Sequence, residues 1–128
     1  MATKTVLAIG IDPAVVDISR FPGLSADLLR NHIDAELQRL RDAGYEVVPC
    51  FIDFGATAEQ VTATALASRR FDCVMIGAGL REPAEHLLLF EKILNLVHHR
   101  APTACICFNS SPADTLDAVR RWVRPASA

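Results

Sequence analysis

The sequence lacks an excess of charge of either sign, and it lacks any long hydrophobic run. Its 128 residues carry 13 Lys and Arg against 15 Asp and Glu, a formal net charge of −2 at pH 7. This balance argues against a nucleic-acid partner bound through bulk positive charge. No apolar run approaches the roughly 18 residues of a membrane-spanning helix, so no membrane partner is expected. The opening MATKTVLAIGID has no signal cleavage motif, and we expect a cytoplasmic protein.

Paired cysteine motifs are also missing. The chain has four cysteines, none in a CxxC pair: Cys50, Cys73, Cys105 and Cys107. Each falls in an apolar run, so buried, reduced thiols are the expected state. Cys105 and Cys107 share one strand face, which leaves a metal or redox role as the alternative, but only Asn109 and Ser110 follow them. Zinc sites need thiolate, imidazole or carboxylate ligands. We therefore predict no metal and no cofactor.

Four apolar runs alternate with four helical patterns along a chain of single-domain length. The runs predict strands over residues 5–11, 45–52, 71–76 and 104–108, and the patterns between and after them predict helices over residues 26–43, 58–69, 83–100 and 112–123. This alternation predicts one α/β domain over residues 1–128, with a parallel sheet covered on both faces. Pro49 cannot donate to a central ladder, so its strand is an edge. Right-handed crossovers then give the strand order 2-1-3-4.

Particular residues mark the expected helix ends. The markers are Ser25 as first N-cap, Gly44 after the first helix, Thr57 with Gln60 as a capping box, Pro83 at the first position of the third helix, and Ser111, Pro112 and Asp114 before the last. The connection over residues 12–24 is about twice the usual length of roughly 2–6 residues. It leaves the carboxyl end of the first strand, beside the switch point where open α/β sheets bind ligands. A binding loop and an ordered plug of the sheet end are both consistent with it.

Polar and small residues follow each strand at this same edge. The candidate ligand-binding residues are Asp12, Asp53, Gly77, Gly79, Arg81, His86, Asn109 and Ser110. Free N–H groups at a helix start, together with the guanidinium of Arg81, favour an anionic small molecule such as a phosphorylated sugar or nucleotide. Gly77 and Gly79 lack the third glycine of a dinucleotide fingerprint. A tight turn, solvated carboxylates and a surface histidine are the structural alternative.

The strand order and the acid Asp12 after the first strand resemble small flavodoxin-like, receiver-like domains of bacterial proteins. That resemblance implies a three-layer domain, but Gly77 stands at the phosphoacceptor position, so we expect no phosphotransfer. The segments AIGID, MIGAGLR and APTACICF also resemble small SGNH-type esterases. In that family the nucleophilic serine would fall at about Pro13, and no histidine follows Asp114 or Asp117 as the base.

The expected function is a non-enzymatic small-molecule or anion-binding, regulatory module with its site at the carboxyl end of the sheet. The alternatives are a degenerate SGNH-like hydrolase and a self-assembling structural subunit. Residues 87–90 (LLLF) are too apolar for one buried helix face, and ACICF at residues 104–108 is an unprotected edge. A homodimer through the third helix, the fourth strand or both is therefore expected.

Overall fold

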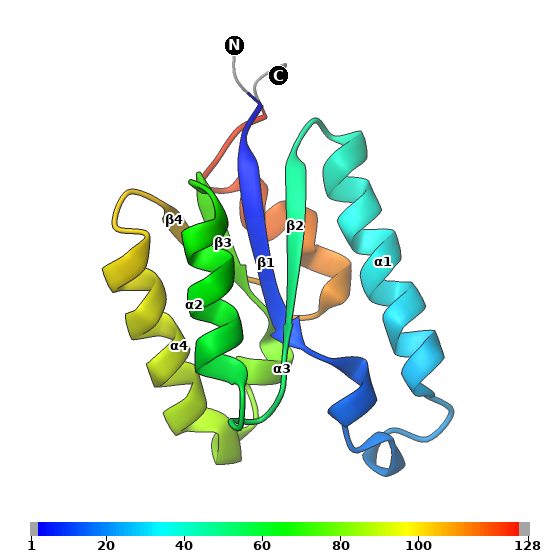
Figure 1. The fold of residues 1–128 in the computed structure, drawn as a ribbon. Helices are drawn as coiled ribbons and strands as arrows, with labels where there is room; N and C mark the ends of the chain where they lie inside the picture. Colours follow the sequence, from blue (N-terminus) through cyan, green and yellow to red (C-terminus); the bar gives the residue numbers. More distant parts are fainter. Residues whose placement is uncertain (1–2, 126–128) are drawn as a thin grey trace.

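A sheet of four parallel strands forms the middle layer of the molecule, in the order β2-β1-β3-β4 (Figure 1). The coordinates are a computed structural model, which describes residues 3–125. The strands are β1 (Thr5–Ile11), β2 (Glu46–Ile52), β3 (Cys73–Ile76) and β4 (Cys105–Phe108). Both the parallel direction and the order confirm the prediction, with Pro49 in the edge strand β2.

Helices cover both faces of the sheet, which gives the three layers of a flavodoxin-like fold (Figure 1). One face carries α1 (Ala26–Asp42) and α5 (Thr115–Arg120), and the other carries α2 (Ala58–Ser68) and α4 (Leu87–Arg100). A one-turn helix, α3 (Ala78–Arg81), follows β3. The connections contain four 3-10 turns: η1 (Pro13–Val15), η2 (Ile18–Arg20), η3 (Ala84–His86) and η4 (Pro112–Asp114).

The alternation of side chains along β1 divides the interior into two cores. Leu7 and Ile9 are fully buried against the layer of α2 and α4. Val6 and Ala8 face the layer of α1 and α5 instead. The first core is filled by large side chains, whereas Ala8 leaves the second core short of volume beneath α1.

Most of the expected helix ends are confirmed. The Ser25 hydroxyl accepts the N–H of Leu28 at 3.0 Å and caps α1. Gly44 follows α1 with φ of 105°, a left-handed conformation that suits glycine. Ser111 and Asp114 form the capping box that starts η4.

The capping box expected at Thr57 and the expected start of the third helix are wrong, whereas α2 does begin at Ala58 as predicted. Thr57 makes no capping bond to its own helix, because its hydroxyl donates to the Asp53 carboxylate at 2.8 Å. The third long helix does not begin at Pro83. The chain already turns helical at Ala78, Pro83 has no N–H with which to continue that turn, and α4 starts only at Leu87.

The last helix is also shorter than predicted. It ends at Arg120, so that Trp122 lies in the turn beyond α5 with 62% of its surface exposed. The expectation that all four thiols are buried holds for three of them, but Cys105 at the start of the edge strand β4 is exposed.

Candidate functional site

An apolar cavity of about 260 Å³ lies between α1 and the carboxyl-end half of the sheet. Its walls come from every layer on that face. The sheet contributes Ala8, Gly10, Pro49, Phe51, Met75 and Gly77, the helix α1 contributes Leu29, Ile33, Glu36 and Leu37, and the β1–α1 loop contributes Val16, Phe21 and Leu24. Beyond β3 and β4, the wall is completed by Ala78, Gly79, Asn109, Pro112 and Thr115. Almost every lining side chain is apolar.

The cavity exists because the central strand carries little volume on this face. A Cβ atom placed on Gly10 would meet no heavy atom within 4 Å, and the same is true of Gly79. The helix α1 packs on β2, on α5 and on the turns η1 and η4, which flank the strand β1. Gly77 has a different role, since a Cβ there would lie 3.4 Å from the carbonyl oxygen of Ile9. Its absent side chain allows β3 to leave the sheet close to β1.

The long β1–α1 connection is an ordered wall of this cavity. Asp12 accepts the N–H of Ala14 at 3.0 Å, which caps η1, and pairs with Arg30 of α1 at 3.0 Å. At the far side of the loop, Arg20 pairs with Glu85 of η3 at 2.9 Å. These contacts fasten the loop to two other segments. The loop closes the sheet end and also lines a cavity. The two interpretations of it, as a binding loop and as a plug, are therefore compatible.

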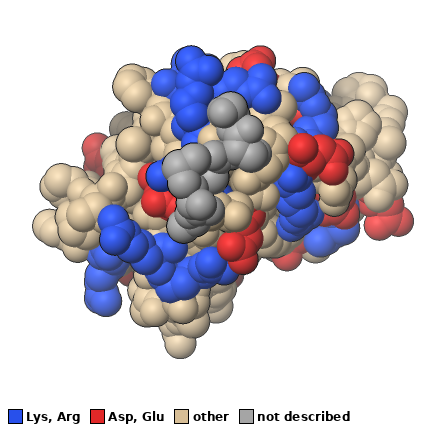
Figure 2. Space-filling view, turned by 90° about the horizontal axis from the view of Figure 1, so that it is seen from above, with Lys and Arg blue, Asp and Glu red and all other residues tan. Residues whose placement is uncertain are grey.

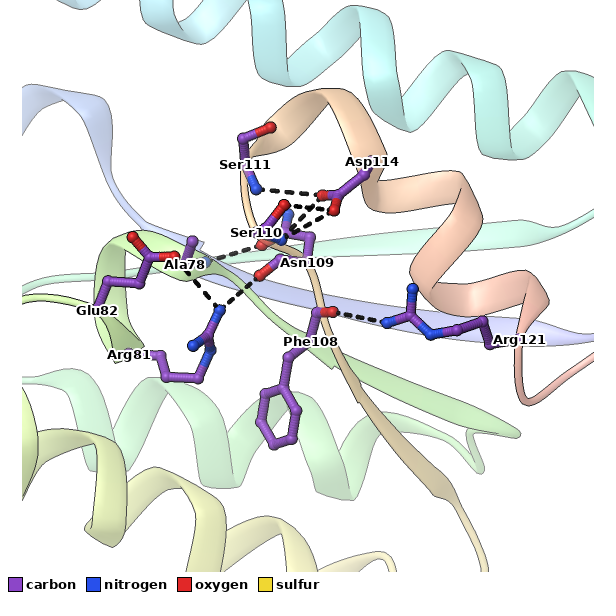
Figure 3. A network of polar contacts seen from close by, with 9 residues as sticks. All are labelled: Ala78, Arg81, Glu82, Phe108, Asn109, Ser110, Ser111, Asp114 and Arg121. Carbon is purple, nitrogen blue, oxygen red and sulfur yellow. Dashed lines mark hydrogen bonds and ion pairs between the residues drawn. The ribbon is translucent and has the colours of Figure 1, made fainter.

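Asn109 joins the turn after β3 to α5 (Figure 3). Its side chain is buried, its amide oxygen accepts the N–H of Ala78 at 2.8 Å, and its amide nitrogen donates to the Thr115 hydroxyl at 3.0 Å. Its carbonyl oxygen accepts a bond from Arg81 at 2.8 Å, and the Arg81 guanidinium also lies over the Phe108 ring. Both predicted ligand-binding side chains thus hold the strand ends together.

The neighbouring carboxylate of Asp114 accepts hydrogen bonds from the residues that follow β4 (Figure 3). It accepts the N–H and the hydroxyl of Ser110 and the N–H of Ser111. These hydrogen bonds, that of the Ser110 hydroxyl foremost, hold the pKa of Asp114 below its ordinary value. The N–H and the hydroxyl of Ser110 therefore both serve this turn as donors to Asp114.

Asp53 and His86 occupy a separate part of the rim. The N–H groups of Gly55 and Thr57, with the Thr57 hydroxyl, donate to Asp53 and lower its pKa. The His86 ring stacks on Phe54 with a centroid separation of 4.4 Å. Neither Asp53 nor His86 lines the cavity.

Three of the eight candidate residues, Gly77, Gly79 and Asn109, border the cavity, and the other five do not. Sequence reasoning missed the apolar walls, because Leu29 and Ile33 match the pattern of an ordinary core-facing helix stripe. One signal was present in the sequence. Ala8 and Gly10 put two small residues in succession on one face of a central strand, which cannot fill the space beneath a helix.

Two buried thiols lie on the same side of the sheet, away from the rim. The Sγ atoms of Cys73 and Cys107 are 3.5 Å apart. This thiol contact and burial raise the pKa of Cys73, so the thiol is not an activated nucleophile. Within residues 3–125, no group of three or more His, Cys, Asp or Glu side chains is arranged to hold a metal ion.

In comparisons with known proteins, the chain matches no family model, no curated protein and no solved structure. None of the helices in the described part of the chain is long and apolar enough to cross a membrane. The molecule is defined by its own features as an α/β domain of flavodoxin-like architecture with an apolar cavity at the carboxyl end of its sheet.

Proposed function

We propose that this protein is a non-enzymatic binding module for a small, predominantly apolar molecule held in the cavity beneath the β1–α1 loop. The observation that carries this proposal is an apolar space of about 260 Å³ that opens above Gly10. An apolar cavity of roughly 150 Å³ can hold benzene, and natural ligand pockets start at roughly 300 Å³. The space therefore suits a compact ligand of one or two rings, or an alkyl chain of comparable volume.

The lining favours an uncharged ligand over the anion expected from the sequence. Glu36 is the one ionisable side chain among the lining residues, and it is paired with Arg39 at 2.9 Å, so the lining offers no cation to an anionic ligand. The expected cation, Arg81, is engaged by the Asn109 carbonyl and by Glu82 at 3.6 Å, and it does not line the cavity. A ligand that keeps most of its surface apolar avoids the cost of burying charge against these walls.

The arrangement supports binding more than hydrolysis. Acyl transfer needs a nucleophile within hydrogen-bond reach of a base. The hydroxyl in the lining belongs to Thr115, and it donates to the Pro112 carbonyl at 2.8 Å while it accepts from Asn109. Asp12 and His86, the acid–base candidates, belong to other contacts.

The test is a titration with N-phenyl-1-naphthylamine, a neutral fluorophore whose emission rises in apolar surroundings. We expect saturable binding of one probe per chain. Gly10→Val places a side chain in the cavity and should weaken binding at least about tenfold. Ala67→Val is the control, because it adds two carbons to an exposed position of α2, against the three that Gly10→Val adds in the cavity. Equal binding by wild type and Gly10→Val would place the probe elsewhere and overturn the proposal, as would binding of AMP that Arg81→Ala abolishes.

A further inference from the structure

Positive side chains gather at the opposite end of the molecule from the cavity. In a parallel α/β fold the strands begin, and the helices end, at the same edge of the sheet (Figure 1). Figure 2 looks onto this amino end and shows Lys and Arg side chains spread across it, with Asp and Glu side chains between them. The residues at these strand starts and helix ends are Lys4, Arg39, Arg41, Arg69, Arg70, Arg100, Arg120 and Arg124; Arg121 also follows α5, but its guanidinium donates to the carbonyl of Phe108 at the carboxyl end of β4.

Fewer of the cations at the amino end than of those in the rest of the chain form an ion pair with a carboxylate. Elsewhere four cations lie 2.9–3.9 Å from a carboxylate, in the pairs Arg20–Glu85, Arg30–Asp12, Arg81–Glu82 and Lys92–Glu59. At the amino end, within residues 3–125, two cations have such a partner: Arg39 lies 2.9 Å from Glu36, and Arg69 lies 2.9 Å from Glu46. The overall charge of −2 thus conceals an end with an excess of cations, since the acids at the same strand starts and helix ends are Asp42, Glu46 and Asp72.

Helix dipoles account for only part of this pattern. Arg41, Arg100 and Arg120 lie in last turns, where a cation stabilises the helix carboxyl terminus. Arg70 and Arg124 are exposed and lie outside any helix, so no such stabilisation applies to them. Cations that neither pair nor cap, and that repel one another, lower stability unless an anion is bound.

The only tryptophan of the chain belongs to the same end. Trp122 is 62% exposed and directly follows Arg121. The next carbonyl, that of Val123, accepts a hydrogen bond from Tyr45 at the start of β2, which fixes this turn at the amino end. An exposed indole beside guanidinium groups is typical of a surface that meets lipid headgroups, where the ring lies at the boundary of the apolar layer.

We propose that the amino end of the molecule binds an anionic lipid surface, with arginines on the headgroup phosphates and Trp122 at headgroup depth. A planar partner fits cations that come from several elements and spread in two dimensions over one end (Figure 2). A nucleic-acid strand would be followed by cations along a line or groove. The carboxylates at this edge, Asp42, Glu46 and Asp72, are fewer than the cations around them, so the surface keeps an excess of positive charge.

The test uses the full chain and vesicles of phosphatidylcholine mixed with phosphatidylglycerol in equal parts, with pure phosphatidylcholine as reference. Because Trp122 is the single tryptophan, its emission reports contact at the proposed surface. We expect a blue shift and protection from acrylamide on the anionic vesicles alone, both lost at high salt. Arg70→Ala with Arg124→Ala should weaken binding about thirtyfold, roughly fivefold for each cation.

The control removes the same charge from paired positions away from this end, Arg20→Ala with Lys92→Ala, and should bind as wild type does. Equal weakening by the control would show that net charge, rather than this end, decides binding. No blue shift on anionic vesicles would overturn the proposal. Quenching of Trp122 by a single-stranded oligonucleotide without any vesicle binding would also overturn it, in favour of a nucleic-acid partner.

Discussion

Filling the cavity from Gly10 should make the protein more stable while it blocks the site. A Cβ at Gly10 would meet nothing within 4 Å, and the residue has an ordinary strand conformation. Each buried methylene or methyl group contributes about 0.8 kcal/mol, and replacement of a strand glycine adds roughly 0.5–1 kcal/mol. Gly10 is only half-buried, which reduces the first term. We expect Gly10→Ala to raise the free energy of unfolding by about 1 kcal/mol and Gly10→Val by about 2 kcal/mol.

Urea denaturation measures both variants. The midpoint should rise from wild type to alanine to valine with an unchanged slope, since the surface exposed on unfolding hardly changes. Gains in stability at the cost of binding are typical of residues that a functional site keeps small. A loss of more than about 1 kcal/mol for Gly10→Val would mean that the side chain collides with its surroundings. The space above Gly10 would then be closed in solution, and the reasoning about the cavity would fail.

Three further predictions concern the rim and the outer surface. Asn109→Ala leaves the Ala78 N–H and the Thr115 hydroxyl short of a partner and should cost about 2–4 kcal/mol by urea denaturation; a cost near zero would refute its bridging role. The lowered pKa of Asp114 stabilises the fold at neutral pH, and this contribution is lost as pH falls below the ordinary value of 3.8. The stability gap between wild type and Asp114→Asn should therefore close in acid, and a gap independent of pH would contradict it. We also propose the homodimer expected from the sequence, because Leu88 of α4 is 71% exposed: Leu88→Glu should convert a dimer to a monomer in sedimentation equilibrium, and a monomeric wild type would refute the contact.

The architecture was predictable because several independent signals agree on it. Apolar runs of strand length alternate with capped helices, and Pro49 alone places β2 at the edge. The local errors arose at helix starts, where a side chain outside the helix bonds to a group that we expected to act within the helix. The Asp53 carboxylate accepts a hydrogen bond from the Thr57 hydroxyl, which therefore does not cap α2. The amide oxygen of Asn109 accepts the N–H of Ala78, where α3 begins ahead of Pro83. The Asn109 contact is set by the meeting of strand ends in space and is not contained in the local sequence, whereas Asp53 lies four residues before Thr57 and its bond to that hydroxyl is a local one.

The candidate site was harder to predict, because the same polar groups serve structure and function. At the carboxyl edge of a parallel sheet every chain must turn into a helix, and the freed N–H groups need acceptors. Asp53 and Asp114 meet that need with nearly all of their hydrogen-bonding capacity. Polar residues at such an edge therefore indicate a ligand only where the backbone N–H groups already have acceptors without them. An unfilled apolar space has no comparable structural role, since a cavity lowers the stability of the fold. For this reason Gly10, which bears no functional group, indicates a binding site more strongly than the charged residues around it.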